Sequence, residues 1–574
     1  MAERQMTKGE GRRTKDEGQR TNDGGRGSNF RRPTSNFPPR FSPEAKHALI
    51  LGAVALLVSC VPYLAGYAAQ TPDRVFSGAV FDLYDYHTHL GEMQLGLRGE
   101  WLHRVLSTSE GHDGTLMRTF FIALGHVARL SGLSLPLVYQ VARVLFGALF
   151  LVAVYRFIAA LQPGASVRRT AFALVAFSSG LGWLVQIVAP AGPTDISPID
   201  FWLIDANSFF SILIFPHFTA AMALLLEVFT RLLNSLRTNG PADDSTHVPI
   251  LPYFITIAVY SLLLTSIHPY AVAIIIGPAI AFGVFQSIRR QAPPRRFWQL
   301  TAAVLIGAAP VLIYSAVVFV SEPVFKQWAE QNVTLSPPPI YYVLGFGLVL
   351  AFAAIGLRRF VRERGERAWL VVTWIVLIAV MVYLPVGIQR RFSEGVHVPL
   401  SLIAAYGLTA LGERLSTRAR FVAVNFALAL AAMSNAYMVL SQTAQAALRD
   451  VALFHPGDLI AAIDWLGRHS EWTDTALAAE STGSLIPARI GHRVVLGHWA
   501  ETVAYADRQQ DVAAFFNAST PDADRVELLN RLGVRFVVQG DAERVLGGFD
   551  PARVDYLEQA YDSREVMVYR VQLP

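Results

Sequence analysis

Two stretches near the start of the chain decide the fold: the apolar run HALILGAVALLVSCVPYLAGY at residues 47–67 and the segment FDLYDYHTHLGE at residues 81–92. A bilayer core about 30 Å thick needs about 20 helical residues at a rise of about 1.5 Å each, so the first stretch predicts a membrane span. The second gathers carboxylates, imidazoles and aromatic rings just beyond that span. The sequence therefore predicts ionisable chemistry at a membrane surface.

Further apolar runs of similar length follow this start. We predict about eleven spans, at residues 47–67, 137–160, 170–189, 208–232, 250–268, 269–288, 297–320, 339–357, 368–386, 393–412 and 419–441. The two runs that meet at His268 could instead form a single broken helix. The run 115–132 is interrupted by Arg118, His126 and Arg129, so we predict an amphipathic helix at the interface. The predicted fold class is an α-helical polytopic membrane protein.

The composition supports this class and excludes others. Of 574 residues, 53% are hydrophobic and 16% are charged, whereas a soluble protein has about 25% charged residues. A conventional soluble enzyme and a wholly disordered chain are therefore excluded. The single cysteine, Cys60, excludes an intrachain disulfide framework and a multi-cysteine metal site.

The two ends of the chain differ from the middle. Residues 1–46 are basic and nearly free of apolar side chains, which predicts a disordered tail. Residues 442–574 combine a helical pattern at 458–468 with strand-like runs at 476–478, 493–496, 534–538 and 566–571. We predict three parts: the tail 1–46, a transmembrane domain 47–441 with an outer loop 68–136, and a small extracytoplasmic α/β domain 442–574.

The arginines of the short loops predict the orientation. With a cytoplasmic N-terminus, the cytoplasmic loops carry Arg168, Arg169, Arg231, Arg237, Arg289, Arg290, Arg295, Arg296, Arg358, Arg359, Arg362, Arg364, Arg367, Arg414, Arg418 and Arg420. Positive charge in short cytoplasmic loops is the usual topology signal. It accounts for the net charge of +5, so no nucleic-acid partner is needed. The expected location is the cell membrane, with the C-terminal domain outside the cytoplasm.

The first outer loop holds the strongest candidates for catalysis. Asp82 and Asp85 lie beside aromatic residues near the end of a span, where partial desolvation raises the affinity of a carboxylate for a proton or a metal ion. They are candidates for a general base or a divalent-cation ligand (Mg or Mn). His87, His89 and Glu92 follow at helical-neighbour spacing as substrate-binding candidates. The alternative is a solvated acidic loop without a role in catalysis.

More ionisable residues occur at the outer ends of later spans. These are Asp205, His217, His268, Arg390 and Arg391. Ionisable groups at membrane depth are costly and usually face a cavity or a partner, so together they favour one outward-facing polar cavity. The arginines suit a lipid phosphate, because a guanidinium binds phosphate oxygens in a bidentate fork. The alternatives are interhelical hydrogen bonds for the histidines and snorkelling to headgroups for the arginines.

Several catalytic motifs are absent from the sequence. It contains no GxxxxGK[ST], no GxGxxG after a strand, no HExxH and no GxSxG. ATP-driven transport and serine-hydrolase chemistry therefore lose support.

The order of these parts resembles a family. A first span, a long outer loop with an acidic motif, many further spans and an outer C-terminal domain resemble the GT-C superfamily of membrane glycosyltransferases. The segment Asp85–Leu90 is similar to the first-loop element of bacterial members related to the dolichyl-phosphate-mannose and undecaprenyl-phosphate-sugar transferases. The segments 463–466, 487–489, 497–499 and 536–540 look like the outer domain of bacterial relatives. The chain lacks the tight pair of acids seen in some members, since Asp82 and Asp85 are three residues apart.

The resemblance implies a reaction and its partners. A hexose or pentose on a polyprenyl phosphate passes, with inversion, to an acceptor hydroxyl on a glycan, lipid or protein at the extracytoplasmic side. Asp85 would be the base, with Asp82 as second candidate and His87 orienting it or binding the phosphate. Arg390 and Arg391 would hold the lipid phosphate, and His217 and His268 would line the cavity. Arg489, His498, Trp499 and Glu501 would contact sugar.

Two other functions stay open at this point. A lipid or sugar transporter or flippase predicts internal repeats, which the sequence does not show convincingly. An oligosaccharide ligase or assembly factor would also use outer arginines and histidines, but the acidic loop after the first span favours a transferase with a carboxylate base.

Overall fold

The computed structural model describes residues 42–188, 197–236 and 249–572. Most of the predicted basic tail, residues 1–41, lies outside the described residues. Helix α1 begins at Pro43, so the last four residues of that predicted tail form its first turn. From Pro43 onward the chain is a single unit in which membrane helices and C-terminal elements contact each other.

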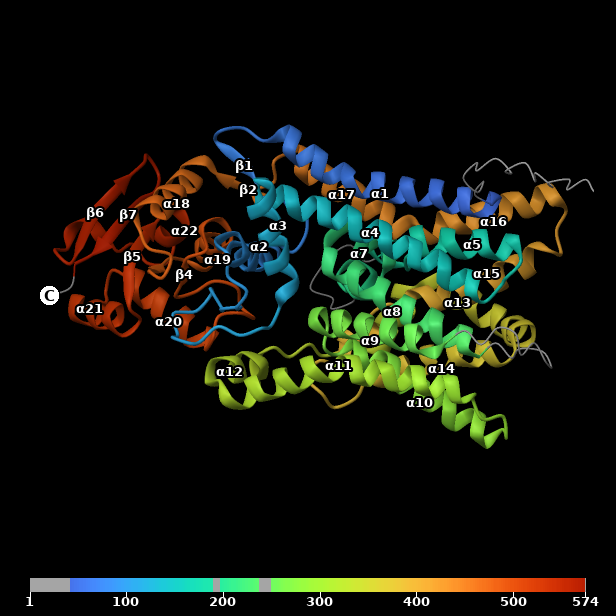
Figure 1. Cartoon of the computed structure of the whole chain (residues 1–574). Coiled ribbons are helices and arrows are strands. Elements are labelled where there is room, and N and C mark those ends of the chain that lie inside the picture. Colours follow the sequence, from blue (N-terminus) through green and yellow to red (C-terminus); the bar gives the residue numbers. More distant parts are fainter. Residues whose placement is uncertain (1–41, 189–196, 237–248, 573–574) are drawn as a thin grey trace, which may run out of the picture. The chain divides into compact units, whose positions relative to one another are not determined.

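Apolar helices, most of them long, form the membrane part (Figure 1). They are α1 (Pro43–Ala69), α4 (Leu135–Ala160), α5 (Ala165–Phe177), α6 (Gly182–Val188), α7 (Ser208–Ile214), α8 (Pro216–Ser235), α9 (Ile250–Ile267), α10 (Ala271–Ile288), α11 (Arg295–Ser321), α13 (Pro339–Arg364), α14 (Glu366–Met381), α15 (His397–Gly412), α16 (Thr417–Ala431) and α17 (Met433–Ala447). Every predicted span coincides with one of these helices or with two in succession.

The number of full-length spans is smaller than the predicted eleven. Among the described residues, seven helices are long and apolar enough to cross a membrane, or up to nine if each bent pair is one span. The predicted spans 368–386 and 393–412 correspond to α14 and α15, which have 16 residues each, fewer than the roughly 20 that a bilayer core requires. The runs that meet at His268 are two helices, α9 and α10. The chain is a multi-pass membrane protein.

Three of the predicted spans are broken. Helices α5 and α6 meet at a bend of 51°. The N–H groups freed at the bend, those of Gly180 and Gly182, donate to the Asp200 carboxylate. The freed carbonyls of Phe177 and Ser178 accept from the Asn435 amide. Such substitute partners are required wherever a helix is interrupted in an apolar medium. The predicted span 208–232 is interrupted between α7 and α8, where Phe215 is extended and Pro216 starts α8. The predicted span 419–441 is interrupted between α16 and α17, which are bent by 49°.

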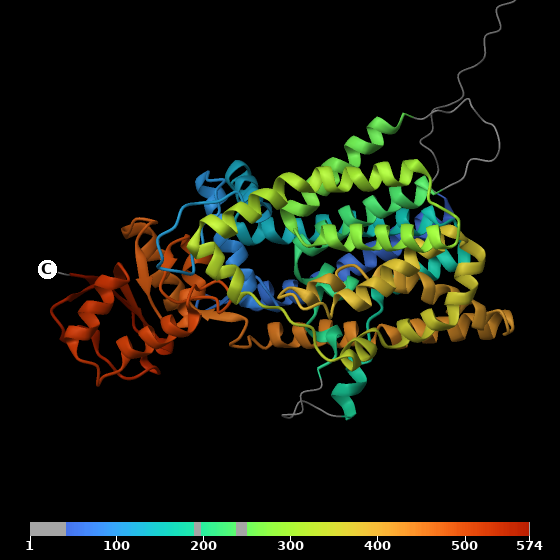
Figure 2. The same cartoon turned by 90° about the horizontal axis from the view of Figure 1, so that it is seen from below.

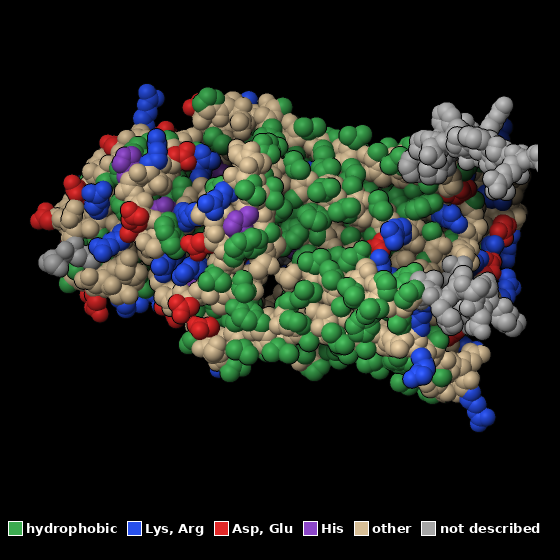
Figure 3. All heavy atoms as spheres, viewed as in Figure 1, with side chains coloured by type: hydrophobic (Ala, Val, Ile, Leu, Met, Phe, Trp, Pro, Cys, Tyr) green, Lys and Arg blue, Asp and Glu red, His purple; other side chains and the backbone are tan. Residues whose placement is uncertain are grey.

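The outer surface of the bundle is apolar. Exposed side chains such as Leu57 on α1, Leu149 on α4, Ile288 on α10 and Ile306 on α11 are between 47% and 77% accessible. Figure 3 shows a broad hydrophobic band over the helices, with charged side chains gathered beyond it at either end. Exposed apolar surface of this extent is expected where lipid replaces water.

Short elements between the spans build one end of the bundle, which we call the α2 end. They include β1 (Arg74–Phe76), α2 (Leu83–Arg98), α3 (Thr119–Ser131), α12 (Pro323–Gln331) and the 3₁₀ turns η1 (Ile199–Phe201), η2 (Ile204–Ala206) and η3 (Gln389–Ser393). Helix α3 falls within the predicted amphipathic run. The opposite end, which we call the arginine-rich end, carries Arg289, Arg296, Arg359 and Arg364. There the Arg364 guanidinium donates to the Leu161 and Gln162 carbonyls.

The C-terminal part is a small α/β structure built around a five-stranded sheet. Its strands are β3 (Thr475–Leu477), β4 (Arg493–Val494), β5 (Val534–Gln539), β6 (Leu557–Asp562) and β7 (Met567–Val571), in the order β4-β3-β5-β7-β6. Strands β3, β4 and β5 are parallel, whereas β7 is antiparallel to β5 and β6. Its helices are α18 (Gly457–His469), α19 (Glu480–Ile490), α20 (Tyr505–Phe516), α21 (Asp522–Arg531) and α22 (Asp541–Arg544), with the turn η4 (Pro551–Arg553).

Alternation along β5 gives this sheet two buried faces. Val537 packs with Val512, Phe515 and Leu529 from α20 and α21. Its neighbours Phe536 and Val538 pack on the other face with side chains of α18 and α19. Because successive strand residues point to opposite faces, one short strand serves both cores.

The sheet structure is joined to the α2 end at three places. Strand β1 pairs antiparallel with β2 (Phe454–Pro456), and α19 packs along α2. The amide of Gln331 on α12 donates to the carbonyls of Ala500 and Thr502. Figures 1 and 2 both place the C-terminal sheet beyond the end of the bundle that carries α2 and α12.

Candidate active site

The acidic segment predicted from the sequence forms the start of α2. Asp82 is the N-cap, with φ of 50°, and its carboxylate accepts from the Asp85 N–H at 3.4 Å. Asp85 lies in the first helical turn, where the exposed N–H groups and the helix dipole favour a negative charge. The two candidate catalytic carboxylates are therefore neighbours at one helix N-terminus.

Asp85 has a partner in the C-terminal part of the chain. Its Oδ1 lies 2.9 Å from His498 Nε2, and the His498 Nδ1 accepts from the Ala500 N–H at 2.9 Å. Because Nδ1 is occupied as an acceptor, the proton of the neutral ring is on Nε2 and is donated to Asp85. The His498 side chain is 3% exposed, whereas that of Asp85 is 40% exposed, so the carboxylate is held by a buried group and open on another side.

The two carboxylates have opposite pKa shifts. Burial alone would raise the pKa of Asp85, but the hydrogen bond and charge of His498, with the charges of His89 and Arg391, lower it below its usual value. Burial beside the charge of Asp85 raises the pKa of Asp82 to about 7. Two adjacent carboxyl groups titrate in separate steps when they interact strongly. These opposite shifts favour an ionised Asp85 and move the titration of Asp82 toward neutral pH.

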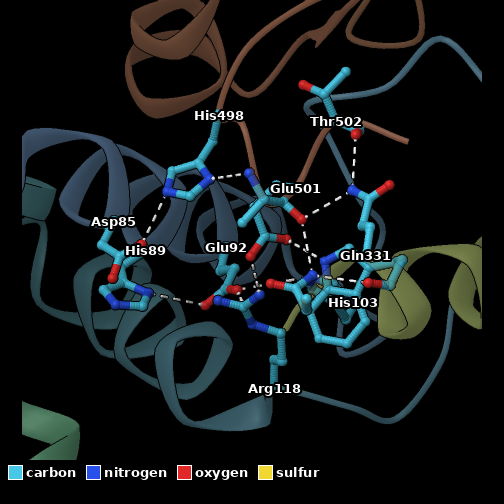
Figure 4. Close-up of polar contacts among 12 residues, drawn as sticks. Asp85, His89, Glu92, His103, Arg118, Gln331, His498, Glu501 and Thr502 are labelled. Carbon is cyan, nitrogen blue, oxygen red and sulfur yellow. Dashed lines mark hydrogen bonds and ion pairs between the residues drawn. The ribbon is translucent and has the colours of Figure 1, made fainter. Parts of the chain in front are cut away.

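A buried ionic network lies beside this pair (Figure 4). Glu92 lies on α2 about two turns after Asp85. Its side chain is 3% exposed and contacts Arg118 Nε at 2.5 Å. Arg118 also donates to Glu501 at 2.6 Å, and Glu501 accepts from the Trp328 indole at 2.9 Å. His89 and His103 lie 3.6 and 3.7 Å from the Glu92 carboxylate. The network ties α2, α3, α12 and the His498 loop together and so fixes the position of Asp85.

The arginine pair lies on η3, next to other predicted residues. Arg391 Nη1 is 3.7 Å from Asp205 Oδ2, and its side chain is 31% exposed whereas that of Asp205 is 1% exposed. Arg390 lies over the Trp202 ring at 5.5 Å. The positive charge of Arg391 acts on both Asp82 and Asp85, as their pKa shifts indicate. The structure thus brings the first outer loop and the turn at residue 390 to one site.

The predicted histidines divide into two groups. The rings of His89, His217 and His268 form a row, with centroid distances of 4.9 Å and 5.2 Å, and His268 Nδ1 lies 2.9 Å from the Glu394 carboxylate. His87 points elsewhere: its Nδ1 pairs with Ser484 Oγ of α19 at 3.0 Å, and its ring packs near His455. Only the first group shares the site of the arginines.

Some site residues were not among the main sequence candidates. Glu394 is fully buried against His268; its position in the segment that carries Arg390 and Arg391 was the available signal. Arg118 appeared in the sequence only as an interruption of an apolar run. His498 was expected to contact sugar, and the structure adds a hydrogen bond from its Nε2 to Asp85. Arg489, also expected to contact sugar, pairs with Asp464.

The carboxylates do not make an evident cation site. Among residues 42–188, 197–236 and 249–572, no three His, Cys, Asp or Glu side chains are grouped so as to hold a metal ion. One side of Asp85 already faces the donor Nε2–H of His498. The side chains present thus do not supply the ligand set expected for Mg²⁺ or Mn²⁺, and no step is derived through a metal.

Comparison with known proteins gives matches in structure alone. No family model matches the chain, and no curated protein matches its sequence. Solved structures do match: apo ArnT from Cupriavidus metallidurans aligns with a TM-score of 0.52 and 13% identity over 92% of this chain and 98% of that one. The chain has the GT-C fold.

Two further GT-C structures are similar over most of the chain. The oligosaccharyltransferase of Archaeoglobus fulgidus, tethered to an acceptor peptide, gives a TM-score of 0.50 at 15% identity over 92% of this chain and 74% of that one. The mycobacterial arabinofuranosyltransferase AftD gives 0.50 at 15% identity over 92% of this chain and 42% of that one. At these identities the likeness concerns the fold, and the predicted GT-C architecture is confirmed.

Proposed function

We propose that the chain is a membrane glycosyltransferase that moves a sugar from a polyprenyl-phosphate donor to an acceptor hydroxyl, with inversion. The observation that carries the proposal is the Asp85 carboxylate, ionised, held by His498 at 2.9 Å and still 40% exposed in the field of Arg391. A base and a phosphate-binding cation at one site are what this transfer needs.

Each group in the site has a task in this reaction. Asp85 removes the proton of the acceptor hydroxyl, whose oxygen attacks the anomeric carbon while the bond from that carbon to the phosphate oxygen breaks. His498 orients the Asp85 carboxylate through the hydrogen bond that its Nε2–H donates. Asp82, when ionised, adds a second negative charge beside Asp85 and so makes it a stronger base.

Arg391 and Arg390 bind the phosphate that leaves with the lipid. A guanidinium keeps its charge throughout and offers two parallel N–H donors to phosphate oxygens. The ion contact of Arg391 with Asp205 is long, at 3.7 Å, which leaves its donors available. A second ArnT structure with the same fold, at a TM-score of 0.51, is bound to undecaprenyl phosphate, which supports a polyprenyl phosphate as the lipid here.

A pocket next to Asp82 suits the acceptor. It has a volume of about 660 Å³ and is lined by Asp82, Tyr84 and His87 of the first outer loop and by residues of α17, α19 and α22. The Nε2 atoms of His87 and His455, which line it, are buried without a hydrogen-bond partner. An acceptor carrying hydroxyl groups on a glycan, lipid or protein would satisfy them.

The α2 end is extracytoplasmic in this proposal, and the N-terminus is cytoplasmic. The charge distribution supports this, because the arginine clusters of the short loops meet at the opposite end of the bundle. The donor sugar therefore enters from the outer leaflet.

Sugar transfer by the purified full-length chain in lipid tests the proposal. A panel of polyprenyl-phosphate hexoses and pentoses serves as donors, and wild type is compared with Asp85→Asn and with the control Asp113→Asn, an exposed acid of the same loop. We expect transfer by wild type and control and a loss of about 10³-fold or more in Asp85→Asn, because removal of a positioned base costs about 10²–10⁴ in rate.

Three outcomes would contradict this scheme. Full activity in Asp85→Asn with an inactive Arg390→Ala would indicate a ligase without a carboxylate base. Lipid donors that cross the bilayer without being consumed would indicate a transporter. Loss of transfer on adding EDTA, restored by Mg²⁺ or Mn²⁺, would show a metal requirement that the described ligands do not account for.

A further inference from the structure

A large hollow lies at the arginine-rich end, remote from Asp85. Its volume is about 1330 Å³, and it is lined by residues of α8, α9, α11, α13 and α14 and of the segment that joins α10 to α11. Three of the lining residues are arginines: Arg231, Arg289 and Arg296. Pockets for small molecules usually measure about 300–1,000 Å³, so this one has room for far more than a single inorganic ion.

The arginines are held by aromatic rings more than by acids. The guanidinium carbon of Arg296 lies 4.9 Å from the Tyr253 ring, and that of Arg289 lies 5.6 Å from the Trp369 ring. Within the described residues neither Arg289 nor Arg296 makes an ion pair, and the Nε of Arg296 is buried without a hydrogen-bond partner. Cation–π contacts fix a guanidinium in place without neutralising it.

The acids nearby do not balance this charge. Arg231 pairs with Glu227, which is shared with Arg156. Glu366, at the start of α14, is the acidic side chain among the described lining residues. With Arg231 paired, Arg289 and Arg296 face one lining carboxylate and leave an excess of positive charge with free donors, which suits an anion with several oxygens.

The surroundings of the hollow are apolar and face lipid. Ile288, at the end of α10, is 77% exposed, and Leu251 at the start of α9 is 62% exposed. Trp298 and Trp369 lie at the same level as the arginines, and tryptophan is enriched at membrane interfaces. An anionic group in the hollow would therefore lie next to the exposed apolar faces of α9 and α10, which contact acyl chains.

We propose that this hollow binds the phosphate headgroup of an anionic membrane phospholipid, with its acyl chains along the exposed faces of α9 and α10. Basic pockets between membrane helices are known to hold such headgroups. A soluble phosphate compound shares the headgroup chemistry but would gain nothing from the apolar border. The inference concerns a different end of the molecule from Asp85 and does not depend on the reaction proposed there.

The loop between α10 and α11 supplies a matched pair of variants. Arg289→Gln with Arg296→Gln removes two charges from the lining of the hollow. Arg290→Gln with Arg295→Gln removes the same number from the same loop at exposed positions outside the lining. Both variants change the topology signal equally, so a difference between them reports the hollow itself.

The experiment measures lipids retained by the purified full-length chain. Protein is exchanged into nanodiscs of phosphatidylcholine with increasing phosphatidylglycerol, and bound lipid is counted by native mass spectrometry together with the thermal midpoint. We expect wild type and Arg290→Gln/Arg295→Gln to retain phosphatidylglycerol and gain thermal stability. We expect Arg289→Gln/Arg296→Gln to need about thirtyfold more of it, since about 1 kcal/mol is lost for each of the two basic residues and about 1.4 kcal/mol corresponds to a factor of ten.

Two results would overturn the inference. Equal losses in both double variants would mean that the binding reflects diffuse loop charge. Equal protection of wild type by glycerol phosphate or inorganic phosphate, without any anionic lipid, would mean that the site takes a soluble phosphate.

Discussion

At the α2 end, acids and bases are buried and paired: the side chains of Glu92, Asp205 and Glu394 are 1–3% exposed and face Arg118, Arg391 and His268. At the arginine-rich end, the charged side chains are more open, as in the pair of Arg359 (25%) and Glu413 (53%). Burying charge is expensive and survives where partners compensate for it. The difference indicates that the α2 end carries the desolvation cost of buried ion pairs, which hold its side chains in fixed positions. Most charges at the other end remain hydrated.

The largest effect is expected where the buried network is broken. Glu92→Gln removes the buried partner of Arg118, which is itself 23% exposed and keeps Glu501 as its remaining acid, so we expect a destabilisation of about 3 kcal/mol, at the low end of the range for a broken buried pair. The thermal midpoint in detergent measures it. Transfer activity should fall with it, because the network positions α2. A midpoint equal to that of wild type would show that Glu92 is not a structural anchor.

A smaller effect is expected in the pH profile. Asp82 loses its proton as the pH rises through about 7, and the new negative charge makes its neighbour Asp85 more basic. Activity should therefore rise between pH 6 and 8, by up to about tenfold, which corresponds to one pKa unit.

The variant Asp82→Asn tests the origin of that rise. Asparagine keeps the N-cap acceptor but cannot ionise, so the profile should become flat over this range while activity remains. His498 and Arg391 face the same carboxylates, but the guanidinium stays charged over this range. An unchanged rise in Asp82→Asn would therefore assign the titration to His498, whose contact with Asp85 raises its pKa.

The smallest effect is expected at the exposed pair of the arginine-rich end. Arg359→Gln removes contacts with Glu363 and Glu413, and exposed pairs contribute at most about 1 kcal/mol. Its midpoint should shift far less than that of Glu92→Gln, and raising the salt concentration should reduce even that shift. Equal shifts in the two variants would remove the contrast between the ends.

Much of the fold was predictable because length and apolarity determine membrane helices. Each predicted run is helical, and the helix at 458–468 and strands near 476, 494, 536 and 568 appear close to their predicted positions. Strand β6 was missed because Leu557–Asp562 pairs through its backbone and is largely exposed. The break between α5 and α6 was missed because Asn435, which donates to the Phe177 carbonyl there, lies 258 positions away in the sequence.

The candidate site was predictable only in part. Position near a span end and charge identified Asp82, Asp85, Asp205, Arg390 and Arg391, but no local pattern could pair Asp85 with His498. Nor could it show that His87 turns toward Ser484 while His89 joins His217. Such pairings depend on how the C-terminal part packs on α2, which is tertiary information.

The hydrogen bond between Asp85 and His498 also sets an order of events during synthesis. The two residues are 413 positions apart, so at about 5–20 residues per second Asp85 waits on the order of 20–80 s for its partner to be made. Glu92 and Arg118 belong to the same early loop and are available to each other almost at once. The scaffold around Asp85 therefore forms while the chain is still being inserted, and the pair of Asp85 with His498 is completed only when the last part of the chain arrives.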